Sequence, residues 1–81
     1  AITTMRGERP VWCGPGVNSE VKTGFVQVRA HGAALPCTYY FDGTLLVATL
    51  EEPLLGLATG QAMVIYDGDR VVGSATICET E

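Results

Sequence analysis

Short runs of alternating hydrophobic and polar residues, separated by glycine and proline, make up most of this chain. The alternation is clearest at residues 25–30, where Val26, Val28 and Ala30 point to one face of an extended strand and the residues between them point to the other. The first set is the more apolar, so it is predicted to face the core. This phase places the intervening Arg29 on the outer side, where it is free to meet a partner.

The same pattern predicts short strands along the whole chain and no sustained helix, because no segment keeps a helical period beyond two turns. The predicted strands are residues 9–12, 25–30, 35–41, 44–50, 63–66 and 71–77. The fold class is therefore all-β, and a small six-stranded antiparallel barrel, closed or nearly closed and resembling translation-factor barrels, is expected. Closure would also remove exposed strand edges. Residues 1–81 form a single domain, with residues 1–8 expected as a loose linker.

The Asp-Gly pair at residues 42–43 lies between two β-rich runs and predicts a two-residue hairpin turn. In that register Tyr40 faces Leu45 and Thr38 faces Val47. Each of these cross-strand pairs would stabilise the sheet by about 0.2–1 kcal/mol.

The last hairpin, across an Asp-Gly-Asp turn, has two registers. One pairs Tyr66 with Asp69. The other begins its turn one residue later and pairs Asp67 with Arg70 and Tyr66 with Val71. We favour the second, because it matches opposite charges and packs an aromatic ring on a β-branched side chain. Glycine as its first central residue also suits a type II′ turn.

Composition limits the function classes. Nine Asp and Glu against five Lys and Arg make the chain acidic, whereas a module that binds nucleic acid through phosphates is normally basic. This chain alone is therefore expected to bind nucleic acid weakly. No apolar run approaches the ~20 residues that span a bilayer. The polar first ten residues are unlike a signal peptide, and we interpret the start at Ala1 as that of a piece cut from a longer chain.

The residues that could carry chemistry form no specific constellation. The three cysteines, Cys13, Cys37 and Cys78, include no Cys-x-x-Cys pair, and His31 is the single histidine. A zinc site is therefore not expected, and the cysteines are interpreted as reduced thiols. His31 follows a predicted strand and has no carboxylate or nucleophile close in sequence, so no catalytic residue and no metal site are predicted.

Three segments resemble the last domain of the tRNA-specific 2-thiouridylases, over roughly residues 9 to 77. Val11-Trp12 resembles the short strand that opens that domain, and the Val-Gln-Val-Arg-Ala-His-Gly run at 26–32 resembles a strand familiar from actinobacterial members. The closing signature is similar too: Glu-Pro at 52–53, Gly-Gln at 60–61 and Tyr-Asp-Gly-Asp at 66–69. The chain departs from the family at Thr59, where proline is usual, and at Ser74-Ala75, where Gly-Gly is commoner.

The resemblance implies that this is the C-terminal barrel of a cytoplasmic, ATP-dependent enzyme that thiolates C2 of the wobble uridine in tRNA. It implies ATP and magnesium for the parent chain but no cofactor in this fragment, and a persulfide carrier as the sulfur donor. The family's catalytic motif, Ser-Gly-Gly-x-Asp-Ser, does not occur here, so the fragment is expected to assist tRNA binding without catalysis and without a membrane partner. The candidate tRNA contacts are Arg29 and His31, then Arg6, Arg9 and Lys22.

Two other readings stay open at this point. Barrels of elongation factor Tu-like translation GTPases also end in a glycine-aromatic hairpin, which would make this a binding and interdomain-contact module. A stand-alone interaction barrel with no tRNA role is the other, and the acidic charge is in keeping with it.

Overall fold

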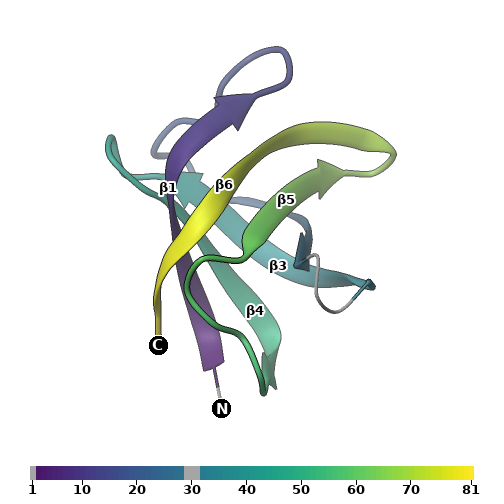
Figure 1. The fold of residues 1–81 in the computed structure, drawn as a ribbon. Helices are drawn as coiled ribbons and strands as arrows, with labels where there is room; N and C mark the ends of the chain where they lie inside the picture. Colours follow the sequence, from purple (N-terminus) through teal and green to yellow (C-terminus); the bar gives the residue numbers. More distant parts are fainter. Residues whose placement is uncertain (1, 29–31) are drawn as a thin grey trace.

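The structure, a computed structural model, describes residues 2–28 and 32–81. These residues contain strands and no helix (Figure 1). The strands are β1 (Ile2–Trp12), β2 (Lys22–Val28), β3 (Ala34–Phe41), β4 (Leu46–Leu54), β5 (Ala62–Asp67) and β6 (Arg70–Thr80). The prediction of an all-β fold is confirmed.

The strands close into a barrel in the order β1-β4-β3-β2-β5-β6, and every neighbouring pair is antiparallel. The predicted six-stranded antiparallel barrel is confirmed. In this order β1 and β2 lie on opposite sides of the barrel, separated by two strands in either direction. Residues 5–12 of β1 pair with β6, which places the two ends of the chain at the same end of the barrel (Figure 1).

Side chains from all six strands fill the barrel. Val26 and Val28 are fully buried, which confirms the predicted core face for these two residues. Ala30, the third residue of that face, lies outside the described residues. Among the described residues no polar or charged side chain is buried, so the interior is held by apolar packing alone. The largest fully buried side chains are Met5, Leu46, Met63, Ile65, Ile77, Val26 and Val28.

The first strand is longer than predicted. It begins at Ile2 rather than Arg9, so the expectation that residues 1–8 form a loose linker is wrong for residues 2–8. Met5 is buried in the core, and the segment pairs with both β4 and β6. The sequence hid this strand because its buried positions in residues 2–8 are Met5 and Gly7, so a single large apolar residue marks the inward face and no alternation is visible.

The β3–β4 turn differs from the predicted two-residue hairpin. Tyr40 pairs with Val47 and Thr38 with Thr49, a register two residues away from the predicted one. The reason is the side chain of Asp42, whose Oδ1 accepts hydrogen bonds from the backbone N–H of Thr44 at 2.8 Å and of Leu45 at 2.6 Å. An aspartate that satisfies two backbone donors stabilises a longer turn.

The β5–β6 hairpin has the favoured register. Tyr66 pairs with Val71 and Asp67 with Arg70, whose charged groups lie 3.6 Å apart. Gly68 has φ +61°, and Arg9 is the one non-glycine residue of the described part with positive φ. Asp69 therefore has negative φ, which is the combination of a type II′ turn.

Candidate functional site

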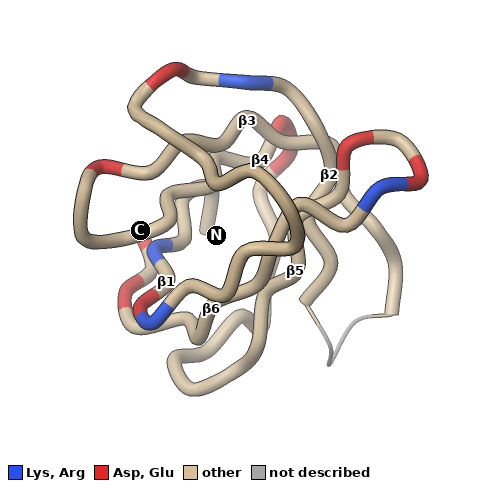
Figure 2. Tube along the Cα trace, turned by 90° about the horizontal axis from the view of Figure 1, so that it is seen from above, with Lys and Arg blue, Asp and Glu red and all other residues tan. Residues whose placement is uncertain are grey.

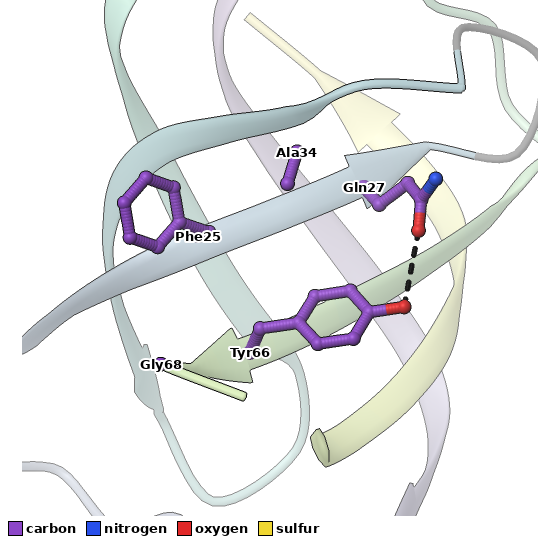
Figure 3. A pocket seen from close by; sticks show the side chains of 5 residues that line it. All are labelled: Phe25, Gln27, Ala34, Tyr66 and Gly68. Atoms are coloured by element: carbon purple, nitrogen blue, oxygen red, sulfur yellow. Dashed lines mark hydrogen bonds between the residues drawn. The ribbon is translucent and has the colours of Figure 1, made fainter. Parts of the chain in front are cut away.

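A groove of about 320 Å³ lies on the outer face of the barrel over β2, β3 and β5. It is lined by Phe25, Gln27, Ala34, Tyr66 and Gly68. Figure 3 shows the Tyr66 ring extending toward Gln27, with the Phe25 ring on the other side of the group. Phe25 and Tyr66 are direct cross-strand partners, so the β2–β5 register places both aromatic side chains on the same outer face of the sheet. Phe25 is 42% exposed although it is a large apolar residue.

Two hydrogen bonds hold the Gln27 amide in the groove. The Tyr66 hydroxyl donates to Gln27 Oε1 at 3.0 Å (Figure 3), and Gln27 Nε2 donates to the backbone carbonyl of Gly32 at 2.7 Å. A primary amide has two N–H donors and two acceptor lone pairs, so one of each is without a partner among the residues that the structure describes. The groove therefore combines two aromatic faces with one oriented donor and one oriented acceptor.

Arg6, a predicted tRNA contact, is engaged with acidic side chains of the C-terminal segment. Its guanidinium pairs with Glu81 and lies 3.7 Å from Glu79, and the side chain is 25% exposed. The hydrogen bond from the guanidinium to the Glu81 carboxylate raises the pKa of Arg6, with the Glu81 and Glu79 charges adding to the effect. Its charge is therefore largely neutralised within the molecule.

Arg9, a second predicted contact, sits in an irregular part of β1. Glu8 pairs with Thr76 and Val11 with Ser74, so three steps along β1 match two along β6, and Arg9 has φ +52° in this bulge. Its side chain is 79% exposed, and Nη2 donates to Glu8 Oε2 at 3.1 Å. The bulge aims the side chain into solvent.

Lys22 opens β2 and is exposed opposite Tyr39. No carboxylate of the described residues forms a salt bridge with it. Because β1 and β2 are on opposite sides of the barrel, Lys22 does not share a patch with Arg6 and Arg9. Blue and red segments are interspersed around the barrel in Figure 2, and the blue ones gather on no single face. Arg29 and His31 lie outside the described residues.

The thiols show no sign of a reactive centre. Burial raises the pKa of Cys37 to about 12, so it stays protonated at neutral pH and is a poor nucleophile. Cys78 Sγ donates to the backbone carbonyl of Arg6 at 3.4 Å, and Cys13 is exposed. Over residues 2–28 and 32–81 no cluster of His, Cys, Asp and Glu could hold a metal ion. The same residues contain no helix able to cross a membrane.

Fold and groove together define a small antiparallel barrel module with a groove on its outer surface. Residues 2–77 match the model of the family described as the aminomethyltransferase beta-barrel domain, and the chain belongs to that family. It is also similar to curated proteins named tRNA-specific 2-thiouridylase MnmA, with which it aligns in their C-terminal part.

Three of these relatives define the extent of the similarity. The protein of Nocardioides sp. is 47% identical over 81 residues, 100% of this chain and 22% of that protein. The proteins of Thermobifida fusca and Streptomyces griseus are 49% and 46% identical over 80 residues, 98% of this chain and 22% and 21% of theirs. The chain thus spans about a fifth of the length of the curated relatives it matches.

Sequence reasoning did not single out the groove residues as a site. Phe25 and Gln27 fall on the outward phase predicted for residues 25–30, and an aromatic ring in that phase is the signal that could have drawn attention to this face. The pairing of β2 with β5 joins residues about 40 positions apart, which no local pattern reveals.

Proposed function

We propose that this chain is the C-terminal barrel of a tRNA-specific 2-thiouridylase and that the longer enzyme thiolates C2 of the wobble uridine in tRNA. The observation that carries the proposal is the 47–49% identity to proteins of that name, over nearly the whole chain. The reported relatives favour this reading over a translation GTPase barrel or a stand-alone module.

Within that enzyme the barrel would help to hold the tRNA. The high pKa of Cys37 and its burial argue against a part for it in sulfur transfer. An outer groove with aromatic faces and an oriented amide suits recognition of RNA instead. The barrel is therefore proposed as a positioning module.

The proposal includes ATP and magnesium as cofactors of the enzyme. ATP and magnesium call for phosphate-binding loops and clustered carboxylates, and no metal-holding cluster occurs in the part of the chain that the structure describes. We assign them, together with a persulfide carrier as sulfur donor, to the rest of a longer enzyme acting in the cytoplasm.

Among the predicted tRNA contacts, Lys22 and Arg9 have the geometry for phosphate binding. Lys22 is exposed and unpaired by any described carboxylate, and Arg9 is directed into solvent from its bulge. Arg6 would have to give up Glu79 and Glu81 first. Arg29 and His31 stay proposed contacts on sequence grounds alone.

A chimera tests the proposed function. The C-terminal segment of the Thermobifida fusca relative that matches this chain is replaced by residues 1–81, and the chimera is expressed in a bacterium lacking its own thiouridylase. Mass spectrometry of digested tRNA is expected to show 2-thiouridine restored, because the barrels share 49% identity.

The control is the same relative cut before the barrel, which is expected to leave the tRNA unthiolated or nearly so. A soluble, folded chimera that leaves the tRNA without 2-thiouridine, while the intact relative restores it, would contradict the proposal.

A further inference from the structure

The outer groove contains an aromatic pair that packing does not explain. Phe25 and Tyr66 are register partners on β2 and β5, and both lie on the outside of the barrel, away from the core cluster. Phe25 keeps 42% of its surface exposed. Cross-strand rings on the open face of a sheet form a platform on which planar groups can stack.

The polar part of the groove is preorganised. Gln27 is held at both ends of its amide, by the Tyr66 hydroxyl at 3.0 Å and by the Gly32 carbonyl at 2.7 Å. Its orientation is therefore set before a ligand arrives, so the ordering cost of binding is low. The N–H and the lone pair of the amide that no described residue engages match a planar ring that carries donors and acceptors on its edge.

The lining of the groove beside the two rings consists of small residues. Ala34 and Gly68 are the small residues of the lining, and the groove encloses about 320 Å³ (Figure 3). A flat ring system can therefore lie against Phe25 and Tyr66 while its edge reaches Gln27.

Charge decides which part of a nucleic acid enters. Asp67 and Asp69 flank Gly68 at one end of the groove, and the only described salt bridge there, from Arg70, engages Asp67. Carboxylates repel phosphates, so the phosphate backbone must leave at the Gln27–Ala34 end. What the groove accepts is the uncharged base.

From these observations we propose that the groove binds a single unpaired nucleobase of an RNA, stacked on Phe25 and Tyr66 and read at its edge by Gln27. The inference rests on the proposed function, which it deepens by naming the part of the tRNA that the barrel holds. It also reconciles RNA binding with an acidic chain, because stacking needs no excess of positive charge.

The test is an NMR titration of the ¹⁵N-labelled chain with a short single-stranded RNA oligonucleotide, followed at the Gln27 side-chain amide. We expect saturable shifts at Gln27 and at the backbone of Phe25 and Tyr66, with little dependence on salt. Phe25→Ala is expected to weaken binding about 10- to 100-fold, the effect of losing one stacking ring. Phe25→Trp should keep it.

Two further variants sharpen the result. Tyr66→Phe keeps the ring but frees the Gln27 amide, so a smaller loss than that of Phe25→Ala is expected. Val11→Ala removes a 63% exposed apolar side chain on β1, at the opposite side of the barrel from β2, and should leave the affinity unchanged. Circular dichroism confirms that each variant is folded.

Equal affinities of Phe25→Ala and Val11→Ala, shifts confined to residues outside the groove, or no binding would each overturn the inference. So would preferential binding of an arginine-rich peptide at the groove, which would make it a protein-docking site. The chimera separates the two claims: restored 2-thiouridine that Phe25→Ala leaves unchanged overturns the nucleobase site alone, and a folded chimera without activity overturns the proposed function.

Discussion

The two sides of the barrel, one centred on β1 and the other on β2, differ in how their polar side chains are paired. On β1, Arg6 is engaged by two carboxylates of the same molecule, Glu79 and Glu81, whereas Arg9 is directed into solvent. On β2, Gln27 is locked in place yet keeps free donor and acceptor capacity beside exposed rings. The comparison teaches that the number of basic residues on a face is a poor guide to where this domain can bind, because pairing within the molecule consumes their charge.

Replacing one glycine by alanine on β1 and one on β2 should produce the largest change in the free energy of unfolding. At Gly24 of β2, a Cβ would lie 2.6 Å from the Tyr66 backbone oxygen and 2.8 Å from the Tyr39 ring. At Gly7 of β1, it would lie 2.6 Å from the Ala75 Cβ and 2.8 Å from the Met63 sulfur. A side chain can yield more easily than a backbone carbonyl, so Gly24→Ala is expected to cost about 3 kcal/mol of unfolding free energy and Gly7→Ala about 1 kcal/mol.

Urea unfolding measures both variants. Ala75→Gly combined with Gly7→Ala is the control, since it removes the methyl group that Gly7→Ala would meet and should recover part of the loss. The expected order is wrong if Gly7→Ala proves the more destabilising of the two.

Releasing the neutralised arginine should convert the β1 side into a phosphate-binding one. The double variant Glu79→Gln/Glu81→Gln removes both carboxylates that engage Arg6. We expect tRNA affinity to rise severalfold at low salt, with a steeper dependence on salt concentration, because one more cation can displace counterions from the RNA. Filter binding at several salt concentrations measures both quantities.

The matched control is Glu51→Gln/Glu52→Gln, which changes the net charge equally but removes carboxylates that form no salt bridge with a described arginine or lysine. If both double variants bind alike, net charge rather than the freeing of Arg6 explains the gain.

The smallest effect should come from the β3–β4 turn, on the strands between the two sides. Hydrogen bonds from the backbone N–H of Leu45 and Thr44 lower the pKa of Asp42 below its ordinary 3.8. The stabilisation is therefore present above pH 3.8 and is lost as the pH falls through the lowered pKa. The difference in stability between the natural chain and Asp42→Ala should shrink in that range.

Thermal unfolding of both proteins at neutral pH and well below pH 3.8 checks this. Glu52→Ala is the control, because the difference it causes should not follow the same titration. A gap between the natural chain and Asp42→Ala that stays constant in acid would refute the role of the charged carboxylate.

Local patterns predicted the barrel and one hairpin well. Alternation at Val26 and Val28 identified a true core face, and opposite charges at Asp67 and Arg70 selected the correct register. The β3–β4 register was missed because the Asp42 side chain, rather than backbone geometry alone, sets the length of the turn. Asp-Gly by itself does not reveal which of the two dominates.

The site was harder to predict than the fold. The groove needs β2 beside β5, a contact between distant segments that the sequence does not encode locally. The sequence instead suggested basic residues as candidate RNA contacts. It did not predict that Arg6 would pair with Glu79 and Glu81, which lie more than 70 residues later in the chain. Pairing over long separations was the missing information in both cases.

The neighbouring ends of the chain have a mechanical consequence. The backbone N–H groups of Thr3 and Thr4 donate to the carbonyl of Glu81, and the Glu81 N–H donates back to Thr4. Because β1 and β6 are antiparallel and both ends leave at this point, a force pulling them apart loads these bonds one after another instead of all together. The barrel should therefore unzip at low force from the Thr4–Glu81 pair, with the β2–β5 groove among the last parts to open.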